Sequence, residues 1–202
     1  MKTYFVTGIS TEVGKTIASA ILVEALKADY WKPIQAGELD YGDAQKVERL
    51  ISNSTSQFHK NSYALKTPMS PHAAAEIDGI TIDLKKINPP KTKNHLIIEG
   101  AGGLLVPLNN SNTILDIIPE KAEVIVVSRH YLGSINHTLL TLNLLEQKGF
   151  KVKIIFSGDA HPTTEDIILK MSKAECIGRI NEEPYFDKNV IKEYAQLFKD
   201  KL

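Results

Sequence analysis

The stretch from residue 8 to residue 16 places the tightest constraint on what this chain can fold into. It reads Gly-Ile-Ser-Thr-Glu-Val-Gly-Lys-Thr and follows directly on the apolar run 4–6. Apolar residues recur after Thr16 at helical spacing, so the pattern predicts a strand, a glycine-bounded loop and a helix. In such a loop, backbone N–H groups and the positive end of the helix bind phosphate oxygens. We therefore predict a phosphate-binding loop in which Lys15 reaches the outer phosphates and the Thr16 hydroxyl binds Mg²⁺.

Apolar runs alternate with helical patterns along the rest of the chain. Strands are expected at residues 4–7, 30–34, 95–99, 124–128, 152–157 and 175–180. Helices are expected at residues 15–28, 42–52, 71–77, 134–148, 163–172 and 188–200. This alternation predicts an α/β fold of the P-loop NTPase type, with a parallel sheet and helices on both faces. We expect residues 1–202 to form a single P-loop α/β domain, with ligands beyond the C-terminal ends of its strands.

Composition excludes several classes of function. The 24 Lys and Arg residues equal the 24 Asp and Glu residues in number, so the formal net charge is zero. Without a basic block, this balance argues against nonspecific nucleic-acid binding. Cys176 is the only cysteine, which excludes an internal disulfide and a Cys-rich zinc site. No apolar run reaches the roughly 20 residues of a membrane span, and Met1-Lys2 leads straight into the first expected strand. We expect a cytoplasmic protein with no nucleic-acid or membrane partner.

A carboxylate at the end of a neighbouring strand normally completes the Mg²⁺ site of a phosphoryl-transfer enzyme. Glu99 ends the apolar run 95–99, and the glycines after it allow backbone to approach a ligand closely. It is the first candidate, with the capping of a turn as the alternative. Asp43 is the second candidate, but it follows Gly42 at an expected helix start, so an N-cap role stays open for it.

Lys32 stands inside the apolar stretch 31–34. A cation there is costly unless it faces an anion. We therefore predict a second anion-binding lysine at the C-terminal end of this strand. The alternative is a lysine on an edge strand that reaches solvent, and Pro33 favours it because proline is confined to edge strands.

The segment 132–137, Leu-Gly-Ser-Ile-Asn-His, follows the fourth expected strand and opens a long helix. Glycine and serine at a helix start leave free N–H groups that suit a carboxylate or a phosphate. Ser134 is equally well placed to act as an ordinary N-cap. The residues alone leave both interpretations open.

Together these segments resemble dethiobiotin synthetase, an enzyme family of biotin biosynthesis, over about residues 3–180. The most specific matches are Thr-Glu-Val-Gly-Lys-Thr at 11–16, Lys-Pro-Ile-Gln at 32–35 and Glu-Gly-Ala-Gly-Gly at 99–103. Ser-Pro-His at 70–72 and the segment 132–137 follow in the same order as in that family. The five residues between Gly8 and Gly14 also agree with its loop.

The resemblance implies a reaction. The family closes a cyclic urea from 7,8-diaminopelargonic acid, CO₂ and MgATP, and it works as a homodimer. One amine takes up CO₂ as a carbamate, ATP phosphorylates the carbamate, and the second amine attacks the mixed anhydride and releases phosphate. No covalent enzyme intermediate is needed, so catalysis would depend on positioning and on charge stabilisation.

The resemblance also implies roles for residues. Lys15 and Lys32 would be catalytic and flank the transferring phosphoryl group and the carbamate. Nucleotide binding would involve Glu12, Val13, Gly14, Lys15, Thr16, Ile17, Asp43, Glu99, Gly100, Ala101 and Gly102. The Mg²⁺ ligands would be Thr16, Asp43 and Glu99. Substrate binding would involve Thr11, Lys32, Ala36, Leu132, Gly133, Ser134 and Asn136, the last four through the substrate carboxylate across the dimer interface.

The chain departs from the family pattern at several positions. Ala36 stands where the family usually has a hydroxyl residue, and Tyr131 where a basic residue commonly precedes Leu-Gly. Gly158 replaces an asparagine that often reads the adenine edge. The segment 181–184 matches poorly, and the C-terminus is shorter than in longer members. We therefore predict weak discrimination between ATP and other purine triphosphates.

Two other functions share this architecture. Partitioning and targeting ATPases usually carry a second lysine near the start of the loop, where this chain has Ser10. Some of them dock on membranes through an amphipathic C-terminal helix. This chain has an apolar stripe at helical spacing there, formed by Val190, Ile191, Tyr194, Leu197 and Phe198. We favour core packing for this stripe. Carboxylate-amidating synthetases share the loop and the carboxylates, but usually carry a glutamine-hydrolysing domain with a nucleophilic cysteine.

Overall fold

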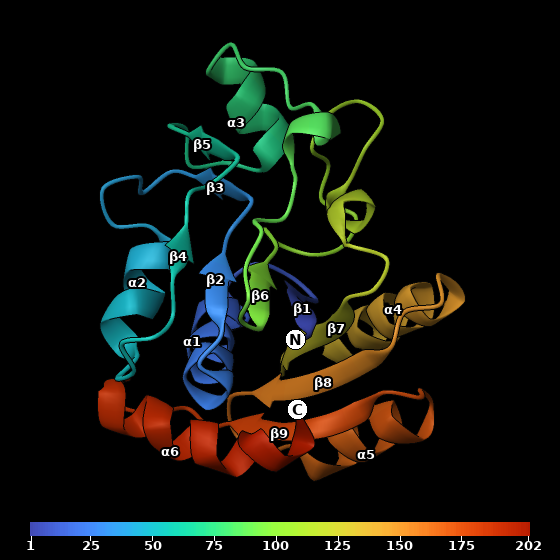
Figure 1. Ribbon diagram of the computed structural model, residues 1–202. Helices are drawn as coiled ribbons and strands as arrows, with labels where there is room; N and C mark the ends of the chain where they lie inside the picture. The colour runs from blue at the N-terminus through green and yellow to red at the C-terminus, as the bar shows by residue number, and fades with distance from the viewer.

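A computed structural model describes residues 1–202 and has a seven-stranded sheet at its centre (Figure 1). The strands run in the order β4-β2-β6-β1-β7-β8-β9, and all neighbouring pairs are parallel. Their bounds are β1 Thr3–Gly8, β2 Asp29–Trp31, β4 Phe58–His59, β6 Leu96–Glu99, β7 Glu123–Arg129, β8 Val152–Ser157 and β9 Glu175–Ile180. The predicted α/β fold is confirmed.

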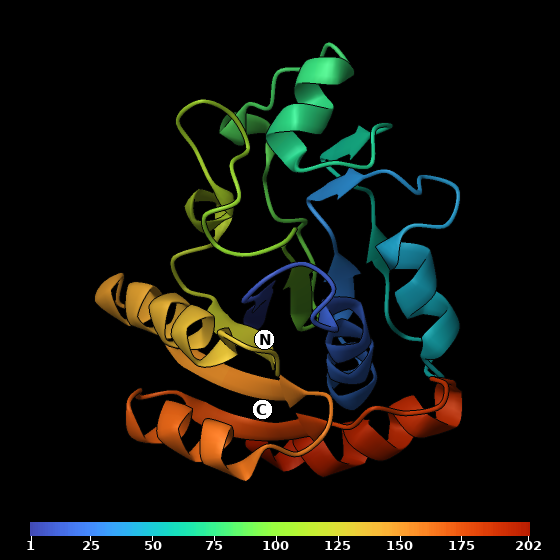
Figure 2. The same ribbon diagram turned by 180° about the vertical axis from the view of Figure 1, so that it is seen from behind.

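The helices cover both faces of the sheet. They are α1 Lys15–Leu26, α2 Asp43–Leu50, α3 Pro71–Ile77, α4 Ser134–Gln147, α5 Pro162–Lys170 and α6 Lys188–Phe198. Short 3₁₀ turns lie at Leu84–Lys86, Ile114–Ile117 and Lys199–Lys201. Helices α1 and α6 pack together on one face, while α4 and α5 pack on the other (Figures 1 and 2).

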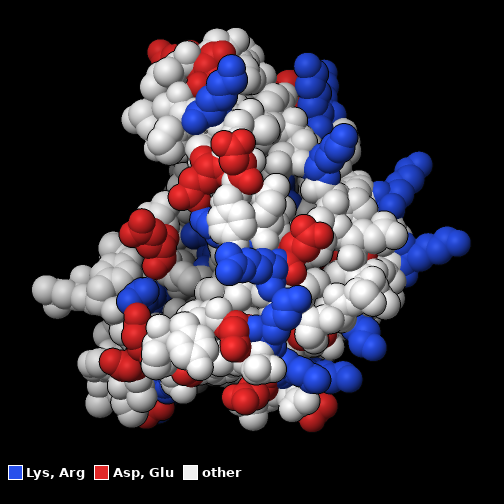
Figure 3. Space-filling view, turned by 90° about the vertical axis from the view of Figure 1, so that its left-hand side faces the viewer, with Lys and Arg blue, Asp and Glu red and all other residues white.

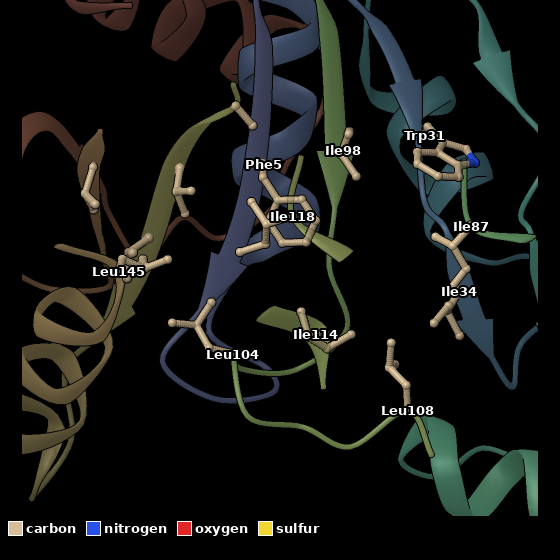
Figure 4. Packing of buried hydrophobic residues seen from close by; sticks show 14 of the residues in the cluster. Phe5, Trp31, Ile34, Ile87, Ile98, Leu104, Leu108, Ile114, Ile118 and Leu145 are labelled. Atoms are coloured by element: carbon tan, nitrogen blue, oxygen red, sulfur yellow. The ribbon is translucent and has the colours of Figure 1, made fainter. Parts of the chain in front are cut away.

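Each face of the sheet has its own buried cluster. The strands alternate between the two clusters, so Phe5 faces one side and its neighbours Tyr4 and Val6 face the other. Figure 4 shows the first cluster, where Phe5 lies beside Ile118 and Ile98. This double coverage explains why the strands read as nearly continuous apolar runs.

One expected strand is wrong in its extent. Residues 30–34 do not form one strand, because β2 ends at Trp31 and the chain leaves the sheet at Lys32 and Pro33. Pro33 has no N–H to donate to a ladder, which explains the break. Beyond it, β3 Ile34–Ala36 pairs with β5 Tyr63–Leu65 in a separate two-stranded sheet. Figure 1 shows β3, β5 and α3 together beyond the end of β2.

The apolar stripe of α6 packs in the core, as we favoured. Ile191, Tyr194 and Phe198 are buried against α1 and β9, and Leu197 is exposed. No helix is both long and apolar enough to cross a lipid bilayer. On the face drawn in Figure 3, basic and acidic side chains are interspersed.

The contact between β9 and α6 gives a prediction of stability. A Cβ added at Gly178 would lie 2.5 Å from Cε1 of the buried Phe198 ring. Because Phe198 is buried and either its ring or the backbone must shift, Gly178→Ala is expected to lower the free energy of unfolding by about 1–3 kcal/mol. Urea denaturation measures this loss. Adding Phe198→Leu to Gly178→Ala is expected to give a smaller loss in the free energy of unfolding than the sum of the two single losses. A loss equal to that sum would contradict the clash.

Candidate active site

A cleft of about 770 Å³ lies beyond the C-terminal ends of the central strands. The phosphate-loop region, the ends of β2, β6 and β7, the segment after β9 and the start of α3 all contribute to its lining. Twelve sequence-predicted site residues line it: Thr11, Glu12, Gly14, Lys15, Thr16, Ile17, Lys32, Ala36, Asp43, Glu99, Ala101 and Gly102. The structure therefore brings together residues from three separate motifs, at the position expected for a parallel sheet.

The loop between β1 and α1 has the shape that its glycines permit. Gly14 precedes α1 in the left-handed conformation, with φ of 94°. A Cβ at Gly8 would come within 2.6 Å of the Val13 side chain and 2.7 Å of the Ser10 carbonyl oxygen. Both positions thus need glycine, for backbone conformation in one case and for space in the other.

Lys15 begins α1 and points back into its own loop. Its Nζ donates to the Ser10 carbonyl oxygen at 2.9 Å. Burial lowers the pKa of Lys15 to about 8; the charge of Lys32 acts in the same direction, while Glu99 opposes the shift. This ammonium group is poorly compensated by the protein, so an anionic ligand in the loop is its natural partner.

Lys32 is held between two carboxylates. Its Nζ lies 2.5 Å from Asp43 Oδ2 and 3.0 Å from Glu99 Oε1, and the lysine is 5% exposed. Burial acts to lower the pKa of Lys32, but Glu99 and Asp43 outweigh it and raise that pKa above its ordinary value. The interpretation of Lys32 as an edge-strand lysine in solvent is therefore wrong.

Glu99 is the common partner in this site. Thr16 Oγ1 donates to its Oε1 at 3.1 Å, and the Tyr30 hydroxyl donates to its Oε2 at 2.9 Å. The carboxylate is buried, with Lys32 supplying a third bond. Glu99 therefore links the phosphate loop, β2 and β6, and the alternative of a turn cap is wrong.

Asp43 is the first residue of α2, and the N-cap is Gly42. The N-cap interpretation of Asp43 is thus wrong by one residue. Its backbone N–H instead donates to Gln35 Oε1 at 3.3 Å, which fixes the start of the helix, and its carboxylate is free to face Lys32. Burial acts to raise the pKa of Asp43, but Lys32 outweighs it and lowers the pKa.

Several predicted residues lie outside the lining of the cleft. Leu132, Gly133, Ser134 and Asn136 start α4, and Leu132 is fully exposed. Ser134 is not the N-cap, because Gly133 takes that position in the left-handed conformation. Val13 is buried in the core beneath the loop. Gly100 presents only its carbonyl oxygen, which accepts from Lys32 Nζ at 3.4 Å.

Sequence reasoning missed three side chains around the cleft. Tyr30 read as an ordinary strand residue, Arg129 fell just beyond the expected strand 124–128, and Glu182 belonged to the poorly matching segment 181–184. Arg129 Nη2 donates to Glu182 at 3.2 Å on the rim. A Cβ at Gly158 would lie 3.7 Å from Glu182 Oε2, so this carboxylate stands beside the position that lacks a side chain. The places of Arg129 at the end of β7 and of Glu182 just after β9 were the available signal, whereas nothing local marked Tyr30 in the middle of β2.

The donor set fits a hard cation that also binds phosphate. Thr16, Asp43 and Glu99 offer a hydroxyl and two carboxylates, which are oxygen ligands. The carboxylates already hold one positive charge, that of Lys32. No group of three or more His, Cys, Asp or Glu residues that could hold a metal ion is present. Mg²⁺ is usually bound through one or two carboxylates together with phosphates and waters, and two carboxylates are what this site offers.

Comparison with known sequences identifies close relatives. Residues 2–190 match a family model described as an AAA domain. The ATP-dependent dethiobiotin synthetase BioD of Christiangramia forsetii is 61% identical over 202 residues, covering 100% of this chain and 98% of that protein. The protein of the same name from Cytophaga hutchinsonii is 48% identical over 198 residues, covering 96% of each chain.

Solved structures share the fold at low sequence identity. The cell division ATPase MinD of Pyrococcus furiosus superposes with a TM-score of 0.62 at 10% identity, covering 100% of this chain and 99% of that one. A plasmid partition protein of Borrelia burgdorferi, bound to AMPPNP, gives 0.61 at 16% identity with the same coverage. At these identities the likeness establishes the fold alone.

The lowered pKa of Lys15 gives a prediction for phosphate binding. A polyphosphate in the loop raises the pKa of Lys15 above its free value of about 8. Binding then takes up a proton between the two pKa values. The affinity for MgADP is expected to be constant below pH 8 and to fall by up to about tenfold per pH unit above it.

Titration calorimetry in buffers of different ionisation enthalpy measures this proton uptake directly. The phosphates of ADP are already ionised at pH 8.5, so they contribute none. Lys15→Met is the control. It is expected to bind MgADP weakly, with no fall in affinity above pH 8. Binding of MgADP at pH 8.5 without proton uptake by the unsubstituted protein would contradict the assignment of Lys15.

Proposed function

The chain belongs to the dethiobiotin synthetase family, and from that premise we propose how its residues carry out ATP-dependent dethiobiotin synthesis. The observation that carries this conclusion is 61% identity to a named dethiobiotin synthetase over the whole chain. The substrates are 7,8-diaminopelargonic acid, CO₂ and ATP, and the products are dethiobiotin, ADP and phosphate. We further propose that residues 1–202 act as one P-loop domain and work in the cytoplasm, where ATP is available.

The proposed reaction has three steps. One amine of the substrate attacks CO₂ and loses a proton, giving a carbamate. A carbamate oxygen then attacks the γ-phosphorus of ATP, ADP leaves, and a mixed anhydride is formed. Finally the second amine attacks the carbonyl carbon, loses a proton and expels phosphate, which closes the cyclic urea.

In this proposal the two lysines stabilise the charge that moves between the reactants. Lys15 holds the outer phosphates, supported by its place in the loop and by its uncompensated charge. Lys32 lies at the end of β2 and faces the carbamate and the transferring phosphoryl group. Thr11 contacts the amine or carbamate end of the substrate. Ala36 lines this part without offering a hydrogen bond, so Thr11 and Lys32 provide the polar contacts there.

The nucleotide is proposed to lie along the loop. Glu12, Val13, Gly14 and Ile17 contribute through the backbone and the start of α1, and Gly100, Ala101 and Gly102 flank the phosphates. Thr16, Asp43 and Glu99 would hold Mg²⁺, which neutralises phosphate charge when it is bound. Lys32 occupies the space between Asp43 and Glu99 in the protein alone, so its ammonium group must be shared with, or displaced by, the incoming cation and phosphates.

A homodimer would bring the remaining substrate ligands into place. The segment 132–136 is proposed to reach across the dimer interface. There the N–H groups at the start of α4 would bind the carboxylate of the substrate that occupies the cleft of the partner subunit. Exposed apolar side chains support an interface here: Leu105 and Leu140 are 65% and 61% exposed beside an apolar groove of about 480 Å³.

The direct test of this function is ADP release from MgATP and bicarbonate, with and without the diamine. Release is expected to depend on the diamine and on CO₂, with a cyclic urea product in the mass spectrum. Lys32→Ala is expected to lose at least about 100-fold in turnover, because one charge-stabilising donor is worth that much.

Release that ignores the diamine would contradict the synthetase and favour a switch ATPase. Phe198→Leu, far from the cleft, is the matched control for Lys32→Ala. Equal loss in both variants would show that the lysine acts through the fold and not in the reaction.

Nucleotide specificity is a separate prediction. Gly158 offers no side chain to the base, so ATP and GTP are expected to support similar kcat/KM, within about tenfold, because one lost hydrogen bond changes affinity by that order. Side-by-side kinetics with the two nucleotides measures the ratio. A preference for ATP well above this range would refute the prediction of weak discrimination.

A further inference from the structure

Tyr30 carries a buried hydroxyl group next to the cleft, and none of the proposed steps uses it. The residue is wholly buried in the middle of β2. Its hydroxyl makes one hydrogen bond, the donation to Glu99 Oε2 at 2.9 Å. A phenol placed deep in a core normally finds a partner for its hydroxyl, but the partner here is a carboxylate of the active site.

The register of the sheet explains how Tyr30 reaches Glu99. In the parallel pair of β2 and β6, Tyr30 lies opposite Ile97. Both side chains belong to the cluster under α1, and Glu99 follows Ile97 by two residues, on the same face of the strand. The phenol leans along the strand toward its C-terminal end, with Phe58 packed against its ring at 5.7 Å between centroids. The ring is therefore fixed on one side by β4 and directed at Glu99 on the other.

The two oxygens of Glu99 consequently have different environments. Oε2 receives the Tyr30 hydroxyl, while Oε1 receives Thr16 at 3.1 Å and Lys32 at 3.0 Å. Thr16 and Lys32 both line the cleft, whereas Tyr30 lies behind it. A carboxylate free to rotate would present either oxygen or both to the cleft. Tyr30 removes that freedom by holding one oxygen on the protein side.

We propose that Tyr30 is a positioning residue, which holds Glu99 so that Oε1 alone faces Thr16, Lys32 and the cation-binding side of the cleft. This inference rests on the proposed role of Glu99 in binding Mg²⁺. The hydroxyl stays a donor throughout the working pH range, because burial and the charge of Glu99 raise the pKa of Tyr30 well above its ordinary value. In this arrangement the cation would meet a preformed ligand, so binding would cost less conformational entropy for ordering the carboxylate.

Tyr30→Phe tests the proposal, since it removes the hydroxyl and keeps the ring. The probe is Mn²⁺ in the presence of a non-hydrolysable ATP analogue, with bound and free Mn²⁺ measured by electron paramagnetic resonance. The Kd for Mn²⁺ is expected to rise about three- to tenfold, which is the order of the net contribution of one hydrogen bond. The Mg²⁺ concentration that gives half-maximal turnover is expected to rise in parallel.

Tyr63→Phe is the matched control. Tyr63 lies in β5 of the small sheet and is also buried. Its hydroxyl bonds only to the backbone of Asp83. Both variants are expected to lower the melting temperature, because each removes hydrogen bonding by a buried tyrosine hydroxyl. Only Tyr30→Phe is expected to change the Kd for Mn²⁺. An unchanged Kd, with any lost activity following the melting temperature, would overturn the proposal.

A double-variant cycle tests whether Tyr30 affects Mn²⁺ binding through Glu99. In a Glu99→Gln background, Tyr30→Phe is expected to add little further change in the Kd for Mn²⁺. Full additivity would overturn the proposal. Tyr30→Met, which also lacks the donor, serves if the phenylalanine variant does not fold. Because Mn²⁺ binding needs no diamine, a protein that binds as expected but makes no cyclic urea would refute the proposed function and leave this inference standing.

Discussion

The pairing of the buried Lys32 ammonium with Asp43 and Glu99 is the interaction on which the rest of the site depends. Two carboxylates and one lysine stand together with little access to water, and each would be costly there without the others. The charge of the lysine lets β6 end on a buried glutamate and lets α2 begin on a half-buried aspartate. These polar atoms of the cleft are thus oriented by one another.

The two cations of the cleft are in opposite electrostatic states. Lys32 is compensated by carboxylates, which raise its pKa, whereas Lys15 has only a carbonyl oxygen and a pKa lowered by burial. In the proposed function, a polyphosphate in the loop would supply the anion that Lys15 lacks. The same polyphosphate and its cation would also interact with the partners of Lys32.

Much of this was predictable from the sequence, because strand and helix periods and strand-end residues are local signals. The loop 8–16 and Glu99 each stand at the end of an apolar run, Lys32 is a cation inside one, and the parallel sheet brings these residues together. The break at Pro33 and the short strands β4 and β5 were not predictable, since two or three residues carry no period. Tyr30 was missed because only the register between β2 and β6 directs it at Glu99.

The position of the second cation separates this chain from the ATPases that share its fold. Ser10 stands where the partitioning and targeting ATPases usually carry a second lysine, and its carbonyl oxygen accepts from Lys15. In the proposed function the second cation is that of Lys32, which directly follows β2 where the chain leaves the sheet at Pro33. A lysine carried on the loop is positioned by the loop, whereas Lys32 is positioned by two carboxylates, those of Asp43 and Glu99. A cation positioned in this way beside the phosphate loop suits phosphoryl transfer at one place in the cleft. The fold by itself does not decide between a synthetase and a partitioning or targeting ATPase.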